Sequence, residues 1–193
     1  AGKSLGDHRL EYTYDDYQAS SHVYVEEEVK TTYPLTDFYV ETPQRDRNKH
    51  ALLYQWDIDN NWAQSLEANV YHQESDRHFY TRTDTVFYQR DVNSMDDLAT
   101  DGALVQLNLQ PLGHHELLAG IQYLNDDVDQ DRHVDTNSWT PPTPSGIDII
   151  RDQASIETWA AFVLDQWALD ERLTLTAGMR QYNVDGDLTF SDR

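Results

Sequence analysis

The sequence predicts an all-β protein, namely a segment of an antiparallel, up-and-down transmembrane β-barrel that is too short to close. Three observations lead to this prediction. Apolar and polar residues alternate with a period of two over several segments, which is typical of strands with two different faces. Short polar connections alternate with long ones, as they do in outer-membrane barrels. No stretch of about 18 apolar residues occurs, so no transmembrane helix is predicted.

The composition limits the classes of function. The 193 residues include 35 acidic and 14 basic side chains, for a formal charge of -21, and no cysteine. Binding to nucleic acid needs clustered Lys and Arg, so it is excluded as a function. Without cysteine there are no disulfides and no thiolate metal sites. The mean hydropathy of -0.76 looks like that of a soluble protein, but a membrane-spanning strand needs only alternate apolar residues, which an average hides.

The first half of the chain predicts three strands. Alternation of Leu and Tyr with polar residues predicts a first, unpaired strand at Arg9–Tyr17. Two further strands, at residues 51–58 and 65–71, form a hairpin around the polar turn 59–61. Twelve tyrosines, five tryptophans and five phenylalanines are too many for a disordered acidic chain, so these segments are expected to fold.

The second half predicts two more hairpins and so about seven strands in all. Their strands lie at 103–109 and 116–123, around a turn at 111–113, and at 154–167 and 172–182, around a turn at 168–171. Trp159, Phe162, Val163 and Trp167 also fit helical spacing, which periodicity alone cannot decide. A strand is predicted there because residues 172–182 alternate strongly and the four-residue connection suits a hairpin.

Connection lengths point to a membrane barrel. Three short turns near 59–62, 111–114 and 168–171 alternate with three long loops at 18–47, 74–98 and 126–152. The strands of roughly 10 to 14 residues match the roughly 9 to 11 that cross a bilayer at a tilt. Trp56, Trp62 and Trp167 lie near the short turns, where they fit an interfacial aromatic girdle or simply the preference of aromatic residues for strands.

The alternation assigns two faces to the predicted strands. One face is apolar and is expected to contact outer-membrane lipid: Leu52, Tyr54, Ile58, Leu66, Val70, Val105, Leu107, Ile121, Leu173 and Leu175. The other is polar and is expected to face a wet lumen: Gln55, Glu67, Asn69, Gln106, Asn108, Gln122, Thr174 and Arg180.

The segment from Thr158 to Arg180, TWAAFVLDQWALDERLTLTAGMR, resembles a hairpin recurrent in TonB-dependent outer-membrane receptors. In that hairpin an aromatic strand ending in an acidic residue and Trp precedes a turn and then Leu-Thr-Ala-Gly-x-Arg. The hairpins around residues 52–70 and 103–123 are similar. The resemblance implies a barrel of about 22 strands with an N-terminal plug, which takes up iron chelates or similar ligands with energy transmitted by the TonB complex.

Residues 1–193 are therefore expected to form part of the barrel domain of such a receptor, in a Gram-negative outer membrane. No plug, TonB box or terminal aromatic strand is found, so contact with the TonB complex is expected through a missing N-terminal region. The chain begins at Ala1 without a start methionine or signal pattern, which suggests a mature product, an excised piece or a fragment.

Four residues are candidates for contact with a ligand. His78 and Tyr80 come first, because haem receptors bind haem through His or Tyr side chains, and His133 lies in another predicted loop. Trp139 precedes Thr140-Pro141-Pro142-Thr143-Pro144, which is stiff and extended and so presents the indole to a ligand or acts as a spacer. Each of these residues is otherwise an ordinary solvated loop residue.

The acidic residues Asp127, Asp129, Asp131 and Asp135 are candidate calcium ligands, because calcium prefers several carboxylate oxygens. The segment departs from an EF-hand loop at its sixth and twelfth positions, where Arg132 and Ser138 stand. The alternative is a solvated acidic loop that meets divalent ions held among lipopolysaccharides.

The sequence has no catalytic arrangement, no Gly-rich phosphate loop and no cofactor motif, so no enzyme and no cofactor are predicted. The predicted function is uptake of a siderophore, haem or another scarce nutrient through an outer-membrane receptor. The alternative is a secreted or periplasmic β-sandwich that binds carbohydrate or protein. A sandwich requires connections of similar length at both ends, whereas the long and short alternation favours the receptor.

Overall fold

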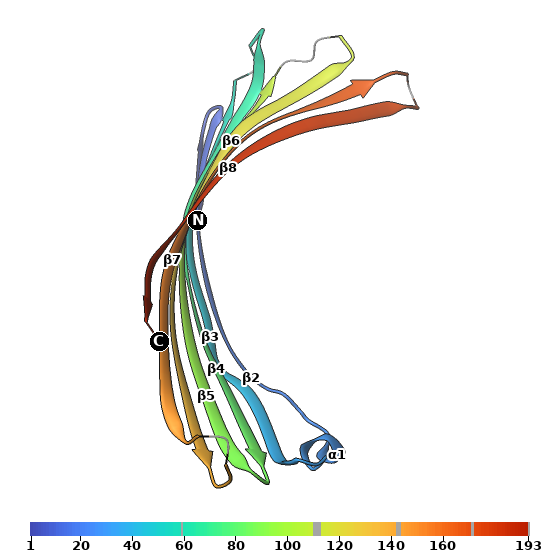
Figure 1. The fold of residues 1–193 in the computed structure, drawn as a ribbon. Helices are drawn as coiled ribbons and strands as arrows, with labels where there is room; N and C mark the ends of the chain where they lie inside the picture. Colours follow the sequence, from blue (N-terminus) through green and yellow to red (C-terminus); the bar gives the residue numbers. More distant parts are fainter. Residues whose placement is uncertain (59, 110–112, 142–143, 171, 193) are drawn as a thin grey trace.

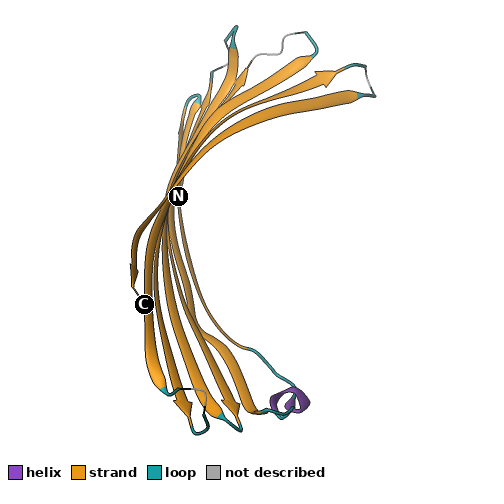
Figure 2. Cartoon of the chain, in the orientation of Figure 1, coloured by secondary structure: helices purple, strands orange, loops and turns teal. Residues whose placement is uncertain are grey.

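The computed structural model is a single antiparallel sheet that curves strongly along its strands (Figures 1 and 2). It describes residues 1–58, 60–109, 113–141, 144–170 and 172–192. The strands are β1 (Gly2–Leu5), β2 (His8–His22), β3 (Leu35–Asp57), β4 (Ala63–Thr85), β5 (Tyr88–Leu109), β6 (His115–Ser138), β7 (Gly146–Ala168) and β8 (Thr174–Asp192), with the short helix α1 (Glu27–Lys30) between β2 and β3.

The strands lie in the sheet in the order of the chain, and each pairs antiparallel with its neighbour. This up-and-down sheet is not closed, which confirms the predicted fold class of an incomplete barrel. A β-sandwich has two packed sheets, so the alternative fold does not describe this chain. None of the helices in the described ranges is long and apolar enough to cross a membrane.

The strand count differs from the prediction by one. The described residues form eight strands. The strand that the sequence does not predict is β1, which has only four residues and is too short to show a period of two. The prediction that Arg9–Tyr17 is unpaired is wrong. This segment lies inside β2, which pairs with both β1 and β3.

The three long loops were the main error of the sequence prediction. Segment 74–98 is a hairpin, because β4 continues to Thr85 and β5 resumes at Tyr88. Segments 18–47 and 126–152 are likewise mostly strand. Strands β3 to β7 are 22 to 24 residues long. Each of them therefore has two to three times as many residues as a strand needs to cross a bilayer.

A physical reason explains the error. In these distal segments most side chains on both faces of the sheet are polar, so the regular alternation that reveals a strand is absent from the sequence. Hydrogen bonds between side chains of neighbouring strands still connect these segments. Gln153 Nε2 donates to Asp129 Oδ2 at 2.8 Å, and Arg82 Nε donates to Asp91 Oδ1 at 2.8 Å. The distal sheet is thus held by the backbone ladder and polar pairs instead of an apolar face.

The register defines two faces, because directly paired residues of antiparallel strands point to the same side. We call the side that carries the row Leu52, Val70, Ala103, Tyr123 and Trp159 the outer face. The opposite side, which carries Asn69, Gln106 and Gln122, is the inner face. The strand members of the two predicted sets separate accordingly.

The exposure of the side chains supports the assignment of the outer and inner faces. Large apolar side chains on the outer face are exposed, among them Val70, Val105, Ile121 and Val163. The buried side chains of Ser94, Thr100, Val134 and Ala160 lie on the inner face. The outer face therefore offers an apolar band to lipid, whereas the inner face is the more enclosed side of the sheet.

Segment 154–167, for which a helix was the alternative, is strand β7. Its orientation follows from the register with β6. Trp159, Val163 and Trp167 pair with outer-face residues, whereas Phe162 pairs with Gly120 on the inner face. The helical spacing of these aromatic residues is coincidental, since they are divided between two faces of a sheet.

Aromatic side chains border the apolar band on both sides. Near the short turns, Trp56 stacks on His8 at a centroid distance of 5.4 Å and Trp167 stacks on His115 at 5.1 Å. On the distal side, Trp159 packs against Tyr123 at 4.6 Å. Two aromatic borders around an apolar band are typical of outer-membrane barrels. The predicted turns extend in part over residues 59, 110–112 and 171, and the Trp139 segment over 142–143, which are outside the described residues.

One glycine is required by a close contact on the inner face. A Cβ atom on Gly120 would lie 2.4 Å from Phe162 Cζ and 2.8 Å from the Val105 carbonyl oxygen. The Phe162 ring covers the glycine, and the Arg180 guanidinium lies 5.3 Å from the ring centroid. This glycine belongs to the Leu-Leu-Ala-Gly sequence of the second hairpin, so its presence there has a packing reason.

We predict that Leu107→Arg and Asn108→Arg differ in effect, because the two residues lie on opposite faces. A charge on the lipid side costs roughly 2–4 kcal/mol at the midplane and about 0–1 kcal/mol near the interfaces. Leu107 shares a row with Trp56 near the border of the band, so we expect a cost between these values, whereas the polar side accommodates the charge. Urea-dependent folding of the full-length receptor into lipid vesicles measures both. Equal losses would contradict the assignment of the faces.

We also predict that Gly120→Ala lowers the free energy of unfolding by about 1–3 kcal/mol, as overpacking does, because the Val105 backbone cannot move without breaking the ladder. Gly146→Ala is the matched control, since no atom lies within 4 Å of its added Cβ. The same vesicle assay applies. The contact has no energetic role if both variants are as stable as the parent.

Candidate ligand-binding site

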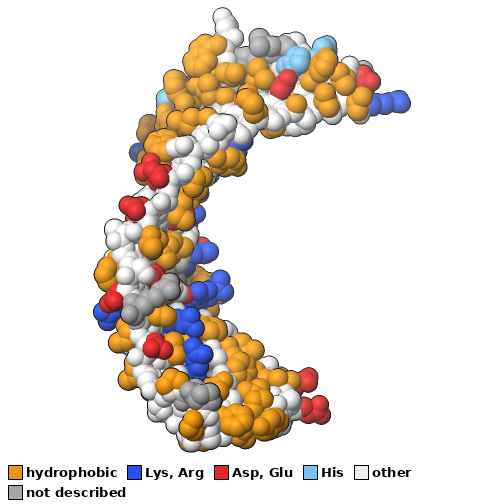
Figure 3. All heavy atoms as spheres, in the orientation of Figure 1, with side chains coloured by type: hydrophobic (Ala, Val, Ile, Leu, Met, Phe, Trp, Pro, Cys, Tyr) orange, Lys and Arg blue, Asp and Glu red, His pale blue; other side chains and the backbone are white. Residues whose placement is uncertain are grey.

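Charges in the distal half of the sheet are divided between the two faces. On the outer face Asp46, Asp76, Asp97 and Asp129 form one row of directly paired residues across β3 to β6. The basic side chains of the strands mostly lie on the inner face: Arg9, Arg45, Arg47, Lys49, Arg77, Arg90, Arg132 and Arg180. Figure 3 shows Lys and Arg gathered along the inner side of the curve, in the lower half of the view.

A cavity of about 610 Å³ lies on this inner face, within the range of small-ligand sites. Two adjacent register rows line it. The first is Tyr17, Arg47, Ser75, Leu98, Val128 and Ala154, and the second is Arg45, Arg77, Asp96, Gln130 and Asp152. The cavity thus combines an apolar floor with a polar and charged margin.

Two of the three arginines at the cavity have carboxylate partners. Arg77 pairs with Asp96 through Nη2 and donates from Nε to Oδ2 at 2.9 Å. Arg47 donates from Nη2 to Asp15 Oδ1 at 3.0 Å. Within the described ranges, no ion pair or side-chain hydrogen bond engages the exposed Arg45.

Neighbouring carboxylates on the two faces have opposite pKa shifts. Partial burial raises the pKa of Asp96, but hydrogen bonds from Gln130 and Arg77 outweigh it, so its pKa lies below the ordinary value. For Asp97 partial burial and the nearby carboxylates of Asp76 and Asp129 all raise the pKa. The inner face therefore stabilises carboxylate charge at this level, and the outer face opposes it.

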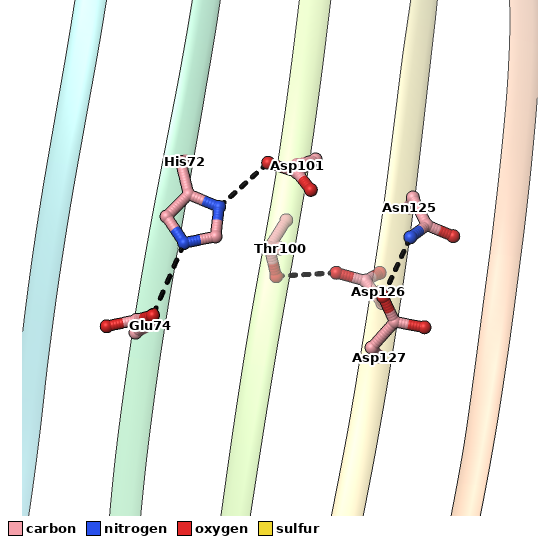
Figure 4. A network of polar contacts seen from close by, with 7 residues as sticks. All are labelled: His72, Glu74, Thr100, Asp101, Asn125, Asp126 and Asp127. Atoms are coloured by element: carbon pink, nitrogen blue, oxygen red, sulfur yellow. Dashed lines mark hydrogen bonds and ion pairs between the residues drawn. The ribbon is translucent and has the colours of Figure 1, made fainter.

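A polar network follows the apolar band on its distal side (Figure 4). His72 and Asp101 are joined by a hydrogen bond of 2.8 Å between Nδ1 and Oδ1, and His72 Nε2 lies 3.5 Å from Glu74 Oε1. On the inner face the Thr100 hydroxyl donates to Asp126 Oδ1 at 2.6 Å. These contacts mark the level at which both faces become polar.

The predicted ligand residues His78, Tyr80 and His133 are in strands and not in loops, and all three lie on the outer face. The structure brings the two histidines to either side of Asn93 on β5. His78 Nε2 is hydrogen-bonded to the Asn93 side chain, and Asn93 pairs with His133 in the ladder. The two histidines thus lie on the two strands that flank β5, on the face opposite the cavity.

Tyr80 and Trp139 have other partners. The Tyr80 hydroxyl donates to Asp91 Oδ1 at 2.5 Å, and partial burial together with this carboxylate raises the pKa of Tyr80 to about 12. The phenol is therefore held as a hydrogen-bond donor. Trp139 lies in the connection between β6 and β7, where its Nε1 donates to the Val86 carbonyl at 2.7 Å.

The predicted calcium ligands lie along the outer face of β6 at every second or fourth residue. Asp131 Oδ2 accepts a hydrogen bond from Arg151, and Asp129 accepts one from Gln153. Alternate residues on an extended strand are about 6.6 Å apart, which separates their carboxylates. In the ranges that the structure describes, no three His, Asp or Glu side chains are grouped so as to hold a metal ion.

Sequence reasoning missed the cavity. Its signal was present in Arg45-Asp46-Arg47-Asn48-Lys49, where basic residues occupy every second position. This is the alternation of a strand with one basic face, although residues 45–47 fall in the predicted loop 18–47. The apolar residues of the floor come from three other strands and have no pattern of their own.

We predict opposite effects for two adjacent substitutions. Asp97→Asn should raise the free energy of unfolding by roughly 0.2–1 kcal/mol, because it relieves repulsion between cross-strand carboxylates, and the gain should shrink in high salt. Asp96→Asn should lower it by about 1–3 kcal/mol, because it removes a charged acceptor from Arg77 and Gln130. Urea unfolding of the full-length receptor at two salt concentrations measures both.

The pH dependence provides a further check. The pKa of Asp97 is raised on folding. As the pH falls towards that pKa, the repulsion between Asp97 and the neighbouring carboxylates weakens, so the increase in the free energy of unfolding caused by Asp97→Asn disappears. The pKa of Asp96 is lowered, so its stabilising contribution is present above the ordinary aspartate pKa and is lost as the pH falls through the lower value. The same sign for both residues would contradict the division of charge.

The comparison with known proteins agrees with this geometry. The family model described as TonB dependent receptor-like, beta-barrel, matches residues 2–192 and so includes all eight strands. No curated protein matches the chain. An up-and-down sheet with an apolar outer band and aromatic borders is what the wall of an outer-membrane barrel requires. The chain belongs to the family of TonB-dependent receptor-like β-barrels, which are receptors and transporters of the outer membrane.

Proposed function

We propose that this barrel takes up a siderophore, haem or a comparably scarce nutrient, with energy supplied by the TonB complex through an N-terminal region of the receptor. The observation that carries the proposal is the family match over residues 2–192. The nutrient and the coupling to TonB are inferences from the family.

The inner-face cavity is the part of this chain best suited to meet the nutrient. It lies between β2 and β7 on the distal side of the apolar band, on the face that is turned away from lipid. Polar and charged groups at its margin can orient a ligand, and its floor can bury an apolar part. A ligand bound there would lie against the wall of the lumen.

The ligand and calcium residues predicted from the sequence would act outside the inner-face cavity. If the nutrient is haem, His78, Tyr80 and His133 would meet it on the outer face, where the two histidines flank Asn93. Trp139 would contact it at the distal end of the sheet. Asp127, Asp129, Asp131 and Asp135 would share calcium with anionic lipid headgroups. The inner-face cavity remains our first choice for the nutrient, because it faces the lumen.

Uptake of labelled iron sources by cells grown under iron limitation tests the proposed function. A strain that lacks the full-length receptor should lose uptake of one labelled iron source among a panel of ferric siderophores and haem. The parent gene should restore this uptake, and inactivation of TonB should abolish it. Undiminished uptake of every iron source in the deleted strain would contradict iron acquisition, and uptake that survives TonB inactivation would contradict the coupling.

A further inference from the structure

Arg45 differs from the other arginines around the inner-face cavity. Arg77 is engaged by Asp96 and Arg47 by Asp15, whereas within the described ranges Arg45 has no carboxylate partner. Its guanidinium has five N–H donors in a planar fork that suits two oxygens of an acidic group. Among the residues that the structure describes, Arg45 is therefore the cation of the cavity that is free to bind a ligand.

The apolar floor lies in the adjacent row. Leu98, Val128 and Ala154 are consecutive partners across β5, β6 and β7, two residues along each strand from the row that contains Arg45. All three are half-buried, and the Tyr17 ring lies at the β2 end of the same row. A flat apolar or aromatic group fits against these side chains.

The remaining charges limit the ligand further. Asp152 lies on the margin of the cavity in the same row as the ion-paired Asp96, with Gln130 between them. A ligand with several negative charges would face these carboxylates with one free arginine, so repulsion would oppose it. A neutral ligand would leave the arginine unused. A ligand with a single acidic group on an apolar body binds the arginine and avoids most of the repulsion from the carboxylates.

We infer that Arg45 anchors the acidic group of a singly charged, amphiphilic ligand whose apolar body packs on Leu98, Val128 and Ala154. This inference rests on the proposed function for its setting, the lumen of an uptake receptor, and names the chemical class of ligand that the cavity selects. Carboxylate and other resonance-stabilised acidic oxygens have the geometry for the guanidinium fork.

Calorimetric titration of the purified full-length receptor with three probes tests the inference. The probes are 2-naphthoate, its neutral analogue 2-naphthamide, and citrate, which has three carboxylates and no apolar body. We expect 2-naphthoate to bind more tightly than either of the others. Arg45→Gln should weaken 2-naphthoate about tenfold, the usual scale for one charge-assisted hydrogen bond, and leave 2-naphthamide unchanged.

Two further variants control the experiment. Arg151→Gln removes an arginine from the outer face of β7, where Arg151 pairs with Asp131, and should leave all three probes unaffected. Arg45→Lys keeps the charge without the fork and should bind 2-naphthoate with intermediate strength. Because this variant preserves the cation, it separates loss of the anchor from a general loss of folding.

Several results would overturn the inference. These are equal binding of 2-naphthoate and 2-naphthamide, tighter binding of citrate, no saturable binding of 2-naphthoate, and unchanged binding in Arg45→Gln. If Arg45→Gln lowers only the stability, Arg45 serves another part of the receptor. The uptake assay is independent of this titration: undiminished uptake of every iron source in the deleted strain, with probe selectivity intact, would contradict the proposed function alone.

Discussion

The backbone hydrogen-bond ladder is the constraint on which the rest of this structure depends. A lipid bilayer offers no partners for N–H and C=O groups, so strands that cross it must pair along their whole length. Strands β3 to β7 pair over nearly all of their 22 to 24 residues. Because a shift of one residue would exchange the two faces, the ladder also places each side chain in lipid or in the lumen.

The same alternation separates charges that are neighbours in sequence. Arg45 and Asp46 lie on opposite faces, as do Asp96 and Asp97. Side chains of one face therefore interact across strands, or with the second residue along their own strand, and not with their sequence neighbours. Most strand arginines lie on the inner face, in a chain with a formal charge of -21. The opposite pKa shifts of Asp96 and Asp97 follow from these different cross-strand neighbours.

The sequence allowed the membrane-level part of the fold to be predicted, because one apolar face imposes a period of two there. The hairpin from Thr158 to Arg180 and the assignment of Leu107 and Asn108 to different faces rest on that signal. Segment 74–98 lacks it, since most side chains on both of its faces are polar. The sequence predicts a loop there, although the segment is a hairpin with Thr85 and Tyr88 at its tip. The candidate residues His78 and Tyr80 were misplaced for the same reason.

By itself the sequence determined the class of the protein, the short turns and the residues of the apolar band, because each of these depends on patterns within about 20 neighbouring residues. Only the tertiary structure decided which distant residues share a row. Arg45 shares one cavity with a floor made of Leu98, Val128 and Ala154 because four strand pairings connect them. Such pairings depend on the register of the whole sheet, which no single segment encodes.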